Sequence, residues 1–215
     1  CSAEFRAAMV GNRNPIVCGV DFGRTNDPTI CWTLERIGDT WWTREVLVLR
    51  DVTTPEQEAA LRVRFAGAQR VCLDYTGPGI GLGDYLVDGH DGLAPLGRWD
   101  PANHQYGLIE LCTFTTGFKR DIFPHLRRAF EAPTKLRIPI STEIREDLHA
   151  MRQIIRNGEY TYSAPRTAEG HSDRCTALAL AHRACGSANG STMPPKAFPR
   201  QTARQLARRN REVEA

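Results

Sequence analysis

The pattern of hydrophobic and polar residues over the first fifty positions is that of β-strands. Residues 16–22 form an apolar run typical of a buried strand, while 29–36 and 41–49 alternate apolar with polar residues, as half-buried strands do. Gly38 and Asp39 stand between the second and third segments and predict a hairpin turn. The three segments therefore predict an antiparallel meander.

A helix and a fourth strand are expected to follow the meander. Thr54, Pro55 and Gln57 have the pattern of an N-cap, a proline at the first helical position and a capping-box partner. The sequence RVCLD at 70–74 has the character of a short buried strand. Because a helix connects it to the meander, we expect this strand to run parallel to an earlier one.

The second half of the chain is expected to alternate helices with short strands. We expect helices near 80–87, 120–131 and 171–185, a strand around 107–114, an extended segment at 136–140 and an edge strand at 159–164. Another amphipathic helix opens at 142–146, and its expected apolar positions are Leu148, Met151, Ile154 and Ile155. The predicted fold class is α/β, a mixed sheet in which an antiparallel three-strand meander joins parallel strands, with helices on both faces.

Composition predicts one soluble, intracellular domain. The chain has 215 residues, of which 41% are hydrophobic, enough for one full core. No stretch approaches the roughly 20 apolar residues needed to cross a bilayer, and the N-terminus lacks the features of a signal peptide, so we expect no membrane partner. The 7 cysteines are an odd number and never fall as CxxC. We expect buried reduced thiols rather than a zinc site or a disulfide framework.

The net charge of +3 hides a basic C-terminal end. Its basic residues are Lys196, Arg200, Arg204, Arg208, Arg209 and Arg211. We expect residues 187–215 to be a solvated, flexible tail that could touch phosphates. The absence of an initiator methionine and the opening CSAEFRAAMVGNRNP suggest a linker remnant over 1–14, which leaves 15–186 as the folded domain.

Three aspartates are candidates for a shared site. Asp21 ends the first buried strand and Asp74 ends the fourth, so in neighbouring parallel strands both would emerge at the carboxyl edge of the sheet, where ligands bind. Asp173 lies on the last predicted helix and shares a face with small and apolar residues that should press against the sheet, namely Ala177, Leu180 and Ala184. The third carboxylate is therefore expected to point inward.

Converging carboxylates repel one another, and burying an unpaired charge is costly. A divalent cation offsets both effects, and ligands that offer only oxygen select Mg²⁺ or Mn²⁺ over Zn²⁺. Each aspartate alone has a simpler explanation, because Asp commonly ends strands and caps helices. Asp27, in TNDP, either shapes a turn or contacts the metal, and His171 is either a first-turn residue or part of the site.

Five segments, taken in order, resemble the nuclease domain of the large terminase subunit of tailed bacteriophages: GVDFGRTNDPTI, RVCLDYTGPGIGLGDYL, TFTTGFKRDIF, LRIPISTEIREDLHAM and GHSDRCTALALA. The resemblance covers about residues 16–185. It implies an RNase H-like fold and an endonuclease that cuts double-stranded DNA during viral genome packaging. It also implies that Asp21, Asp74 and Asp173 bind two divalent metals. Asp27 matches a further acidic position of the family, and Lys119 matches a basic residue after the fifth strand.

The sequence departs from the family's pattern in two places. Arg174 stands where some relatives carry a second acidic residue directly after the helix aspartate. No GxxxxGK[ST] phosphate loop occurs in the chain, so translocation would need the packaging ATPase domain of the same full-length protein. The resemblance further implies a portal and a small terminase subunit as partners. It implies a location in the host-cell cytoplasm, transiently on the viral procapsid and not in the mature virion.

Other classes of protein share parts of this pattern. A resolvase that acts on branched DNA, or an RNase H that acts on RNA hybrids, would use the same carboxylates. The segment GVDFGRTN also resembles the first phosphate loop of actin, sugar-kinase and Hsp70-like ATPases, although those proteins need two such domains. A third alternative is a non-catalytic module that docks onto a portal or a small terminase subunit and holds DNA with its basic tail.

Overall fold

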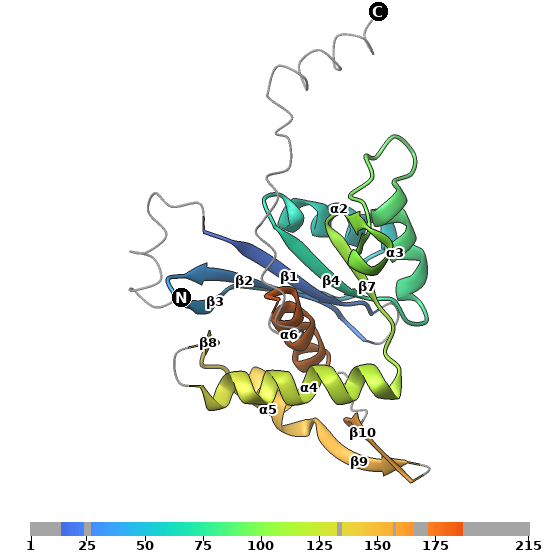
Figure 1. The fold of residues 1–215 in the computed structure, drawn as a ribbon. Helices are drawn as coiled ribbons and strands as arrows, with labels where there is room; N and C mark the ends of the chain where they lie inside the picture. The colour runs from blue at the N-terminus through green and yellow to red at the C-terminus, as the bar shows by residue number, and fades with distance from the viewer. Residues whose placement is uncertain (1–13, 24–26, 133–134, 157, 166–171, 187–215) are drawn as a thin grey trace, which may run out of the picture.

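The computed structural model describes residues 14–23, 27–132, 135–156, 158–165 and 172–186 (Figure 1). Its centre is a six-stranded sheet in the order β7-β4-β1-β2-β3-β8. These strands are β1 (Ile16–Asp21), β2 (Thr29–Ile37), β3 (Thr40–Leu49), β4 (Arg70–Asp74), β7 (Ile109–Cys112) and β8 (Leu136–Arg137). β1, β2 and β3 pair antiparallel, whereas β4, β7 and β8 join in parallel. The mixed sheet with a three-strand meander is therefore confirmed.

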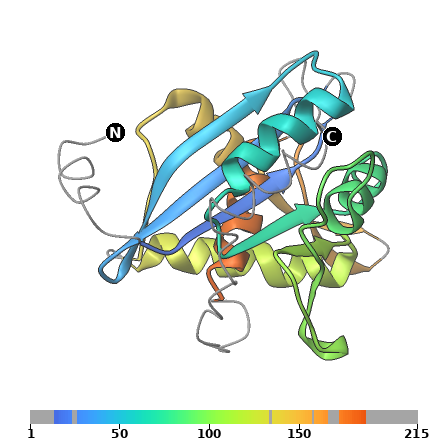
Figure 2. The same cartoon turned by 90° about the horizontal axis from the view of Figure 1, so that it is seen from above.

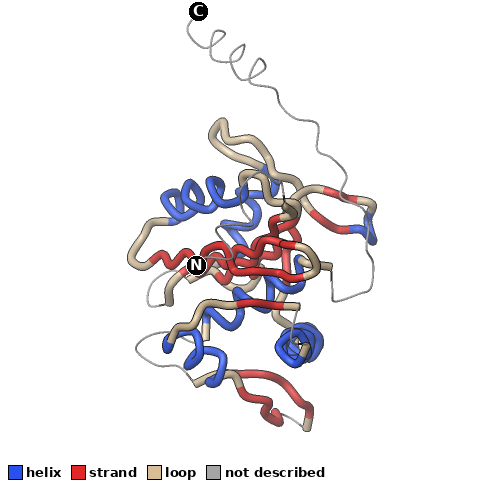
Figure 3. Tube along the Cα trace, turned by 90° about the vertical axis from the view of Figure 1, so that its left-hand side faces the viewer, coloured by secondary structure: helices blue, strands red, loops and turns tan. Residues whose placement is uncertain are grey.

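Helices cover both faces of this sheet, as predicted. α2 (Thr54–Phe65) and α3 (Gly79–Asp88) lie on one face. The other face carries α4 (Thr116–Glu131), α5 (Thr142–Ala150) and α6 (Asp173–Ala184). In Figure 2 the sheet passes between α2 and α6, and in Figure 3 the strands of the sheet run between two layers of helices.

The alternation of side chains along the strands builds a separate core on each face. Val17 and Cys72 pack with the buried residues of α4, α5 and α6, whereas Cys18, Val71 and Leu73 pack with those of α2 and α3. Strands that are buried on both sides read as nearly continuous apolar runs, which is why β1 and β4 were recognisable in the sequence. The same alternation of side chains determines on which face of the sheet a polar residue at the end of each strand lies.

Gly19 lets α6 lie directly against β1. A Cβ atom at this position would stand 2.0 Å from the backbone nitrogen of Ala181 and 2.2 Å from the backbone oxygen of Ala177. Only a residue without a side chain permits such an approach. The contact holds the middle of α6 over the middle of β1, and it fixes where the first turn of the helix falls.

The start of α2 differs from the prediction by one residue. The N-cap is Thr53, and its backbone nitrogen donates to the Glu56 carboxylate at 3.0 Å, so the capping box uses Glu56 instead of Gln57. Gln57 is buried, and its Nε2 donates to the carbonyl oxygens of Gly23 at 3.4 Å and Val52 at 2.9 Å. The amide therefore braces the loop that follows β1 instead of capping the helix.

The helix that opens at 142 is shorter than expected. α5 ends at Ala150, and Ile154 lies in β9 (Arg152–Arg156), which pairs antiparallel with β10 (Glu159–Ser163). This hairpin forms its own two-stranded sheet, so the segment at 159–164 is not an edge strand of the main sheet. A second small hairpin joins β5 (Trp99–Asp100) to β6 (Gln105–Tyr106) around the 3₁₀ turn η1 (Pro101–Asn103).

The expected buried free thiols are found among the residues that the structure describes. Their six cysteines are free thiols, of which Cys185 is half-buried and the rest are buried. Within the described ranges, no helix has the length and apolar character required to cross a membrane. The expected linker remnant, apart from Asn14, and the expected basic tail at 187–215 lie outside the described residues.

Candidate metal centre

Asp21 and Asp74 end two neighbouring parallel strands. β1 and β4 pair in register up to Val20 and Leu73, and the two aspartates directly follow this last pair. Neighbouring strands lie about 4.8 Å apart, and residues two positions apart point to the same face. Because Val17 and Cys72 face α6, the same alternation places both aspartates on the α6 side of the sheet.

Asp173 enters the same corner from α6. It is the first residue of the helix and only 8% exposed. Since Gly19 holds the middle of α6 on β1, the first turn of the helix lies over the carboxyl end of that strand. Thr176, on this turn, hydrogen-bonds to the side chain of Asp21. Three carboxylates that are far apart in the sequence are therefore brought together.

The environment of Asp21 opposes its ionisation. Burial raises the pKa of Asp21 well above its usual value, and the charges of Asp74, Asp173 and Asp27 raise it further, in that order of importance. The hydrogen bond from Thr176 acts in the opposite direction but does not outweigh them. A cation at this point would reverse the balance, because it stabilises the charged form of all the carboxylates at once.

The environment of Asp74 also opposes ionisation of its carboxyl group, but less strongly. Burial raises the pKa of Asp74 to about 6, against the lowering effects of hydrogen bonds to Thr76, the charge of Lys119 and a hydrogen bond to Asp21. Its Oδ1 is buried and has no hydrogen-bond partner. Buried polar atoms without a partner are rare, and a missing ion is one of their recognised causes. The donor set and the unpartnered oxygen both fit a hard divalent cation.

The carboxylates are spread more widely than the ligands of one closed site. Within the described part of the chain, only Cys72, Glu110 and Cys112 bring one ligand atom each within 4.8 Å of one another. Two cations about 3.5–4 Å apart would suit a broader arrangement of acidic side chains than a single ion would. The spread of Asp21, Asp74 and Asp173 is thus compatible with a pair of ions.

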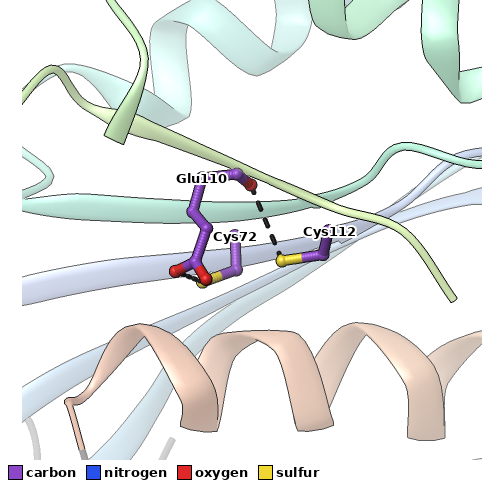
Figure 4. Close-up of side chains that lie close together, drawn as sticks. All are labelled: Cys72, Glu110 and Cys112. Carbon is purple, nitrogen blue, oxygen red and sulfur yellow. Dashed lines mark hydrogen bonds between the residues drawn. The ribbon is translucent and has the colours of Figure 1, made fainter. Parts of the chain in front are cut away.

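The compact group of Cys72, Glu110 and Cys112 has the wrong chemistry for a metal (Figure 4). Glu110 is ion-paired with both Arg70 and Arg183, and although burial opposes them, the two guanidinium groups lower the pKa of Glu110. Burial, together with Cys112 and Glu110, raises the pKa of the Cys72 thiol well above its usual value. A Cys72 thiol that resists deprotonation, beside a glutamate already paired with two arginines, does not attract a cation, so Glu110 instead links β4, β7 and α6 through its ion pairs.

The remaining predicted site residues have different positions. Lys119 lies on the first turns of α4, and the charge of Lys119 lowers the pKa of Asp74. The N-cap of this helix is Thr115, whose side chain accepts a hydrogen bond from the Phe118 nitrogen at 3.1 Å. Asp27 acts on Asp21 from the loop after β1, where its backbone oxygen would stand 2.0 Å from a Cβ on Gly23. His171 lies outside the described residues.

Sequence reasoning missed the two threonines that hold these carboxylates. Thr76 follows Asp74 by two positions and Thr176 follows Asp173 by three, which is one helical turn. A search for hydroxyl groups at such spacings from the candidate aspartates could have found both. The guanidinium of Arg174 pairs with Glu143 and Asp147 of α5.

An apolar groove of about 950 Å³ is lined by residues other than the candidate aspartates. It is bounded by α4, α5 and the β9–β10 hairpin, and its walls include Phe130, Ile140 and Leu148. None of the candidate aspartates lines it. The groove therefore differs from the acidic corner, the place where Asp21, Asp74 and Asp173 meet.

The sheet order and its parallel and antiparallel pairings give the chain a fold similar to that of large terminase nuclease domains. The structure matches the large terminase nuclease of the thermophilic phage G20c, solved with bound magnesium, with a TM-score of 0.60 over 79% of this chain and 81% of that one. It matches the large terminase nuclease domain of bacteriophage SPP1, solved with bound manganese, with a TM-score of 0.51 over 82% and 89%. Sequence identities are 18% and 17%, so the likeness establishes the fold.

A longer protein contains the same fold as one part. The chain matches the large terminase of another thermophilic bacteriophage with a TM-score of 0.53 and 11% identity, covering 80% of this chain and 40% of that one. No protein-family model and no curated protein matches the sequence. The fold assignment therefore comes from the arrangement of elements in space.

Proposed function

We propose that the protein is a metal-dependent endonuclease that cuts double-stranded DNA during phage genome packaging. The observation that carries the proposal is the gathering of Asp21, Asp74 and Asp173 at the carboxyl edge of the sheet, where burial and mutual repulsion raise the pKa of Asp21. The fold supports it, since its structural neighbours are large terminase nucleases solved with magnesium or manganese.

Asp21, Asp74 and Asp173 would hold Mg²⁺ or Mn²⁺, and Asp21 would contribute to both of two ions, because the charges of both other carboxylates act on it. Two divalent cations held there would supply an activated water and charge stabilisation for the leaving oxygen of an in-line displacement at phosphorus. Thr176 and Thr76 orient Asp21 and Asp74 through hydrogen bonds. Asp27 would add a carboxylate at the rim of the site.

Lys119 would neutralise negative charge on the phosphate that is cut. The ammonium group of Lys119 acts on Asp74 from the first turns of α4, so a positively charged side chain lies beside the acidic corner. We also propose His171 for the same task. A cutter of many sequences needs contacts to phosphates and not to base edges, so cleavage should fall steeply as salt rises.

The proposal includes the partners of such an enzyme. The match to a complete large terminase, of which this fold fills 40%, supports a packaging ATPase domain in the same protein. We propose that a portal and a small terminase subunit bring the nuclease to the procapsid. The protein would then work in the host-cell cytoplasm, transiently on the procapsid, and would be absent from the mature virion.

Nicking of supercoiled plasmid DNA tests the proposal. We expect cleavage in Mn²⁺ or Mg²⁺ that stops with EDTA, and we expect Asp74→Ala to lose this cleavage because it removes a proposed metal ligand. Asp39→Ala, which removes an exposed carboxylate in the turn between β2 and β3, should cleave like the parent.

Two results would contradict the proposal. Cleavage by Asp74→Ala as fast as by the parent would remove the metal centre from the mechanism. Faster cutting of four-way junctions or RNA–DNA hybrids than of duplex DNA would instead indicate a resolvase or an RNase H.

A further inference from the structure

The first turn of α6 lacks the usual cap. Its N-cap, Ser172, has left-handed backbone angles of φ 59 and ψ 37, and its side chain makes no capping hydrogen bond. The Ser172 Oγ is buried without a hydrogen-bond partner. A helix N-terminus exposes several backbone N–H groups that need acceptors, so another group has to serve this turn.

That group comes from α5, 27 residues earlier in the chain. The Asp147 carboxylate accepts from the backbone nitrogen of Arg174 at 3.2 Å and from its guanidinium at 3.4 Å. Glu143, one turn earlier on α5, accepts from the same guanidinium at 3.2 Å. The acceptor that α6 does not find in its own N-cap is therefore supplied by a neighbouring helix.

We infer that Asp147 is a positioning residue for the acidic corner, because it caps α6 from α5 and fixes the first turn that carries Asp173. The inference rests on the proposed function, in which Asp173 is a metal ligand. The peptide amide that Asp147 holds is the next one after Asp173 in the chain. A shift of this amide would move the Asp173 carboxylate relative to Asp21.

The charges around Asp147 agree with this role. A carboxylate at a helix N-terminus interacts favourably with the partial positive charge of the free amides. The guanidinium of Arg174 pairs with Asp147, so the cap adds little net negative charge near the other carboxylates. The same guanidinium also pairs with Glu143, so the ion pairs are separate from the backbone amide that Asp147 caps.

Mn²⁺ binding to the full 215-residue chain, measured by calorimetry, tests the inference. Loss of an outer residue that orients a metal ligand typically weakens metal binding about 10–100-fold, and we expect about 10-fold for Asp147→Ala. Asp147→Asn keeps an oxygen that can accept from the Arg174 amide, so it should bind within about threefold of the parent.

Two control variants separate the cap from the ion pairs. Glu143→Gln removes only the outer pair with Arg174, and Arg174→Ala removes the guanidinium but leaves the backbone amide, so both should bind Mn²⁺ within about threefold of the parent. Hydrogen exchange gives a readout without metal. The Arg174 amide should be protected in the parent and in Glu143→Gln, and it should exchange faster in Asp147→Ala.

Unchanged Mn²⁺ binding in Asp147→Ala would overturn the inference, as would equal weakening by Arg174→Ala. If Asp147→Ala does not fold, an unprotected Arg174 amide in the parent would still overturn it. Asp173→Ala separates the two proposals. If that variant binds Mn²⁺ normally, the proposed metal centre fails, whereas if it loses Mn²⁺ and Asp147→Ala does not, only the role of Asp147 fails.

Discussion

At the scale of residues, the charged carboxylates of the acidic corner lower the free energy of unfolding when no metal is bound. Burial raises the pKa of Asp74 to about 6, which means that the folded chain holds this proton more tightly than the unfolded chain. Between the two pKa values the folded state binds more protons, so the free energy of unfolding falls as the pH rises through this range. Above it, the full penalty of the buried charge is present.

Asp74→Asn should therefore stabilise the metal-free protein while destroying its function. At pH 8 in EDTA we expect the free energy of unfolding to rise by about 1–3 kcal/mol, the size of a shift of about two pKa units. Urea unfolding followed by circular dichroism measures it, with Asp39→Asn as an exposed control. Mn²⁺ should raise the stability of the parent but not of Asp74→Asn. If Asp74→Asn were less stable than the parent, the buried charge of Asp74 would not be destabilising the metal-free protein.

His182 predicts a loss of stability in acid. Burial, and then the nearby His125, lower the pKa of His182 to about 4, while an unfolded histidine titrates near 6.5. Between these values the unfolded chain binds more protons, so stability falls as the pH falls from about 6.5 to 4.

The expected cost is about 2 kcal/mol by pH 4.5. His182→Gln should lose less stability than the parent between pH 7 and pH 4.5 in urea unfolding. His104→Gln, at an exposed position, should lose as much as the parent. Equal losses in the parent and His182→Gln would contradict the account.

At the scale of elements, the contact of α6 with β1 sets the geometry of the site. Gly19→Ala would force a Cβ within 2.2 Å of two backbone atoms of α6, so the helix has to shift. We expect a loss of about 2 kcal/mol or more, because overpacking against a backbone cannot be relieved by a rotamer change. Mn²⁺ binding should weaken as well, since the first turn of α6 moves with the helix.

Gly81→Ala is the matched control. Gly81 lies in α3, and a Cβ there would meet nothing within 4 Å. Alanine is the better helix former, so this variant should be about 0.5–1 kcal/mol more stable than the parent. Thermal unfolding of the two variants compares them directly. A Gly19→Ala protein as stable as Gly81→Ala would contradict the close approach.

Elements were predictable where one local signal decided them. The meander followed from alternation, and β4 followed from a short apolar run closed by Asp74. Met151 and Ile154 continue the helical spacing of α5, yet the chain after Ala150 pairs with β10, an effect of tertiary structure that spacing does not record. The cap of α2 was misplaced because Thr53 and Thr54 are both capping residues, and only hydrogen bonds separate them.

At the scale of the whole molecule, the sheet separates two cores and leaves the acidic corner at one edge. The three aspartates could be inferred from the sequence because each sits at the end of a recognisable element. The tie of Arg174 to Asp147 could not be inferred, because it joins residues from two helices through geometry alone. The group around Glu110 was hidden for the same reason, since parallel pairing places Cys72 opposite Glu110.

A crystal of the full chain grown or soaked in Mn²⁺ tests the central claim most directly, through the anomalous signal of the metal. We predict ions bound by carboxylate oxygens of Asp21, Asp74 and Asp173, at the distances of about 2.0–2.3 Å typical of hard cations. Ions bound instead at Cys72 and Glu110, or no ion among the three aspartates at saturating Mn²⁺, would contradict it.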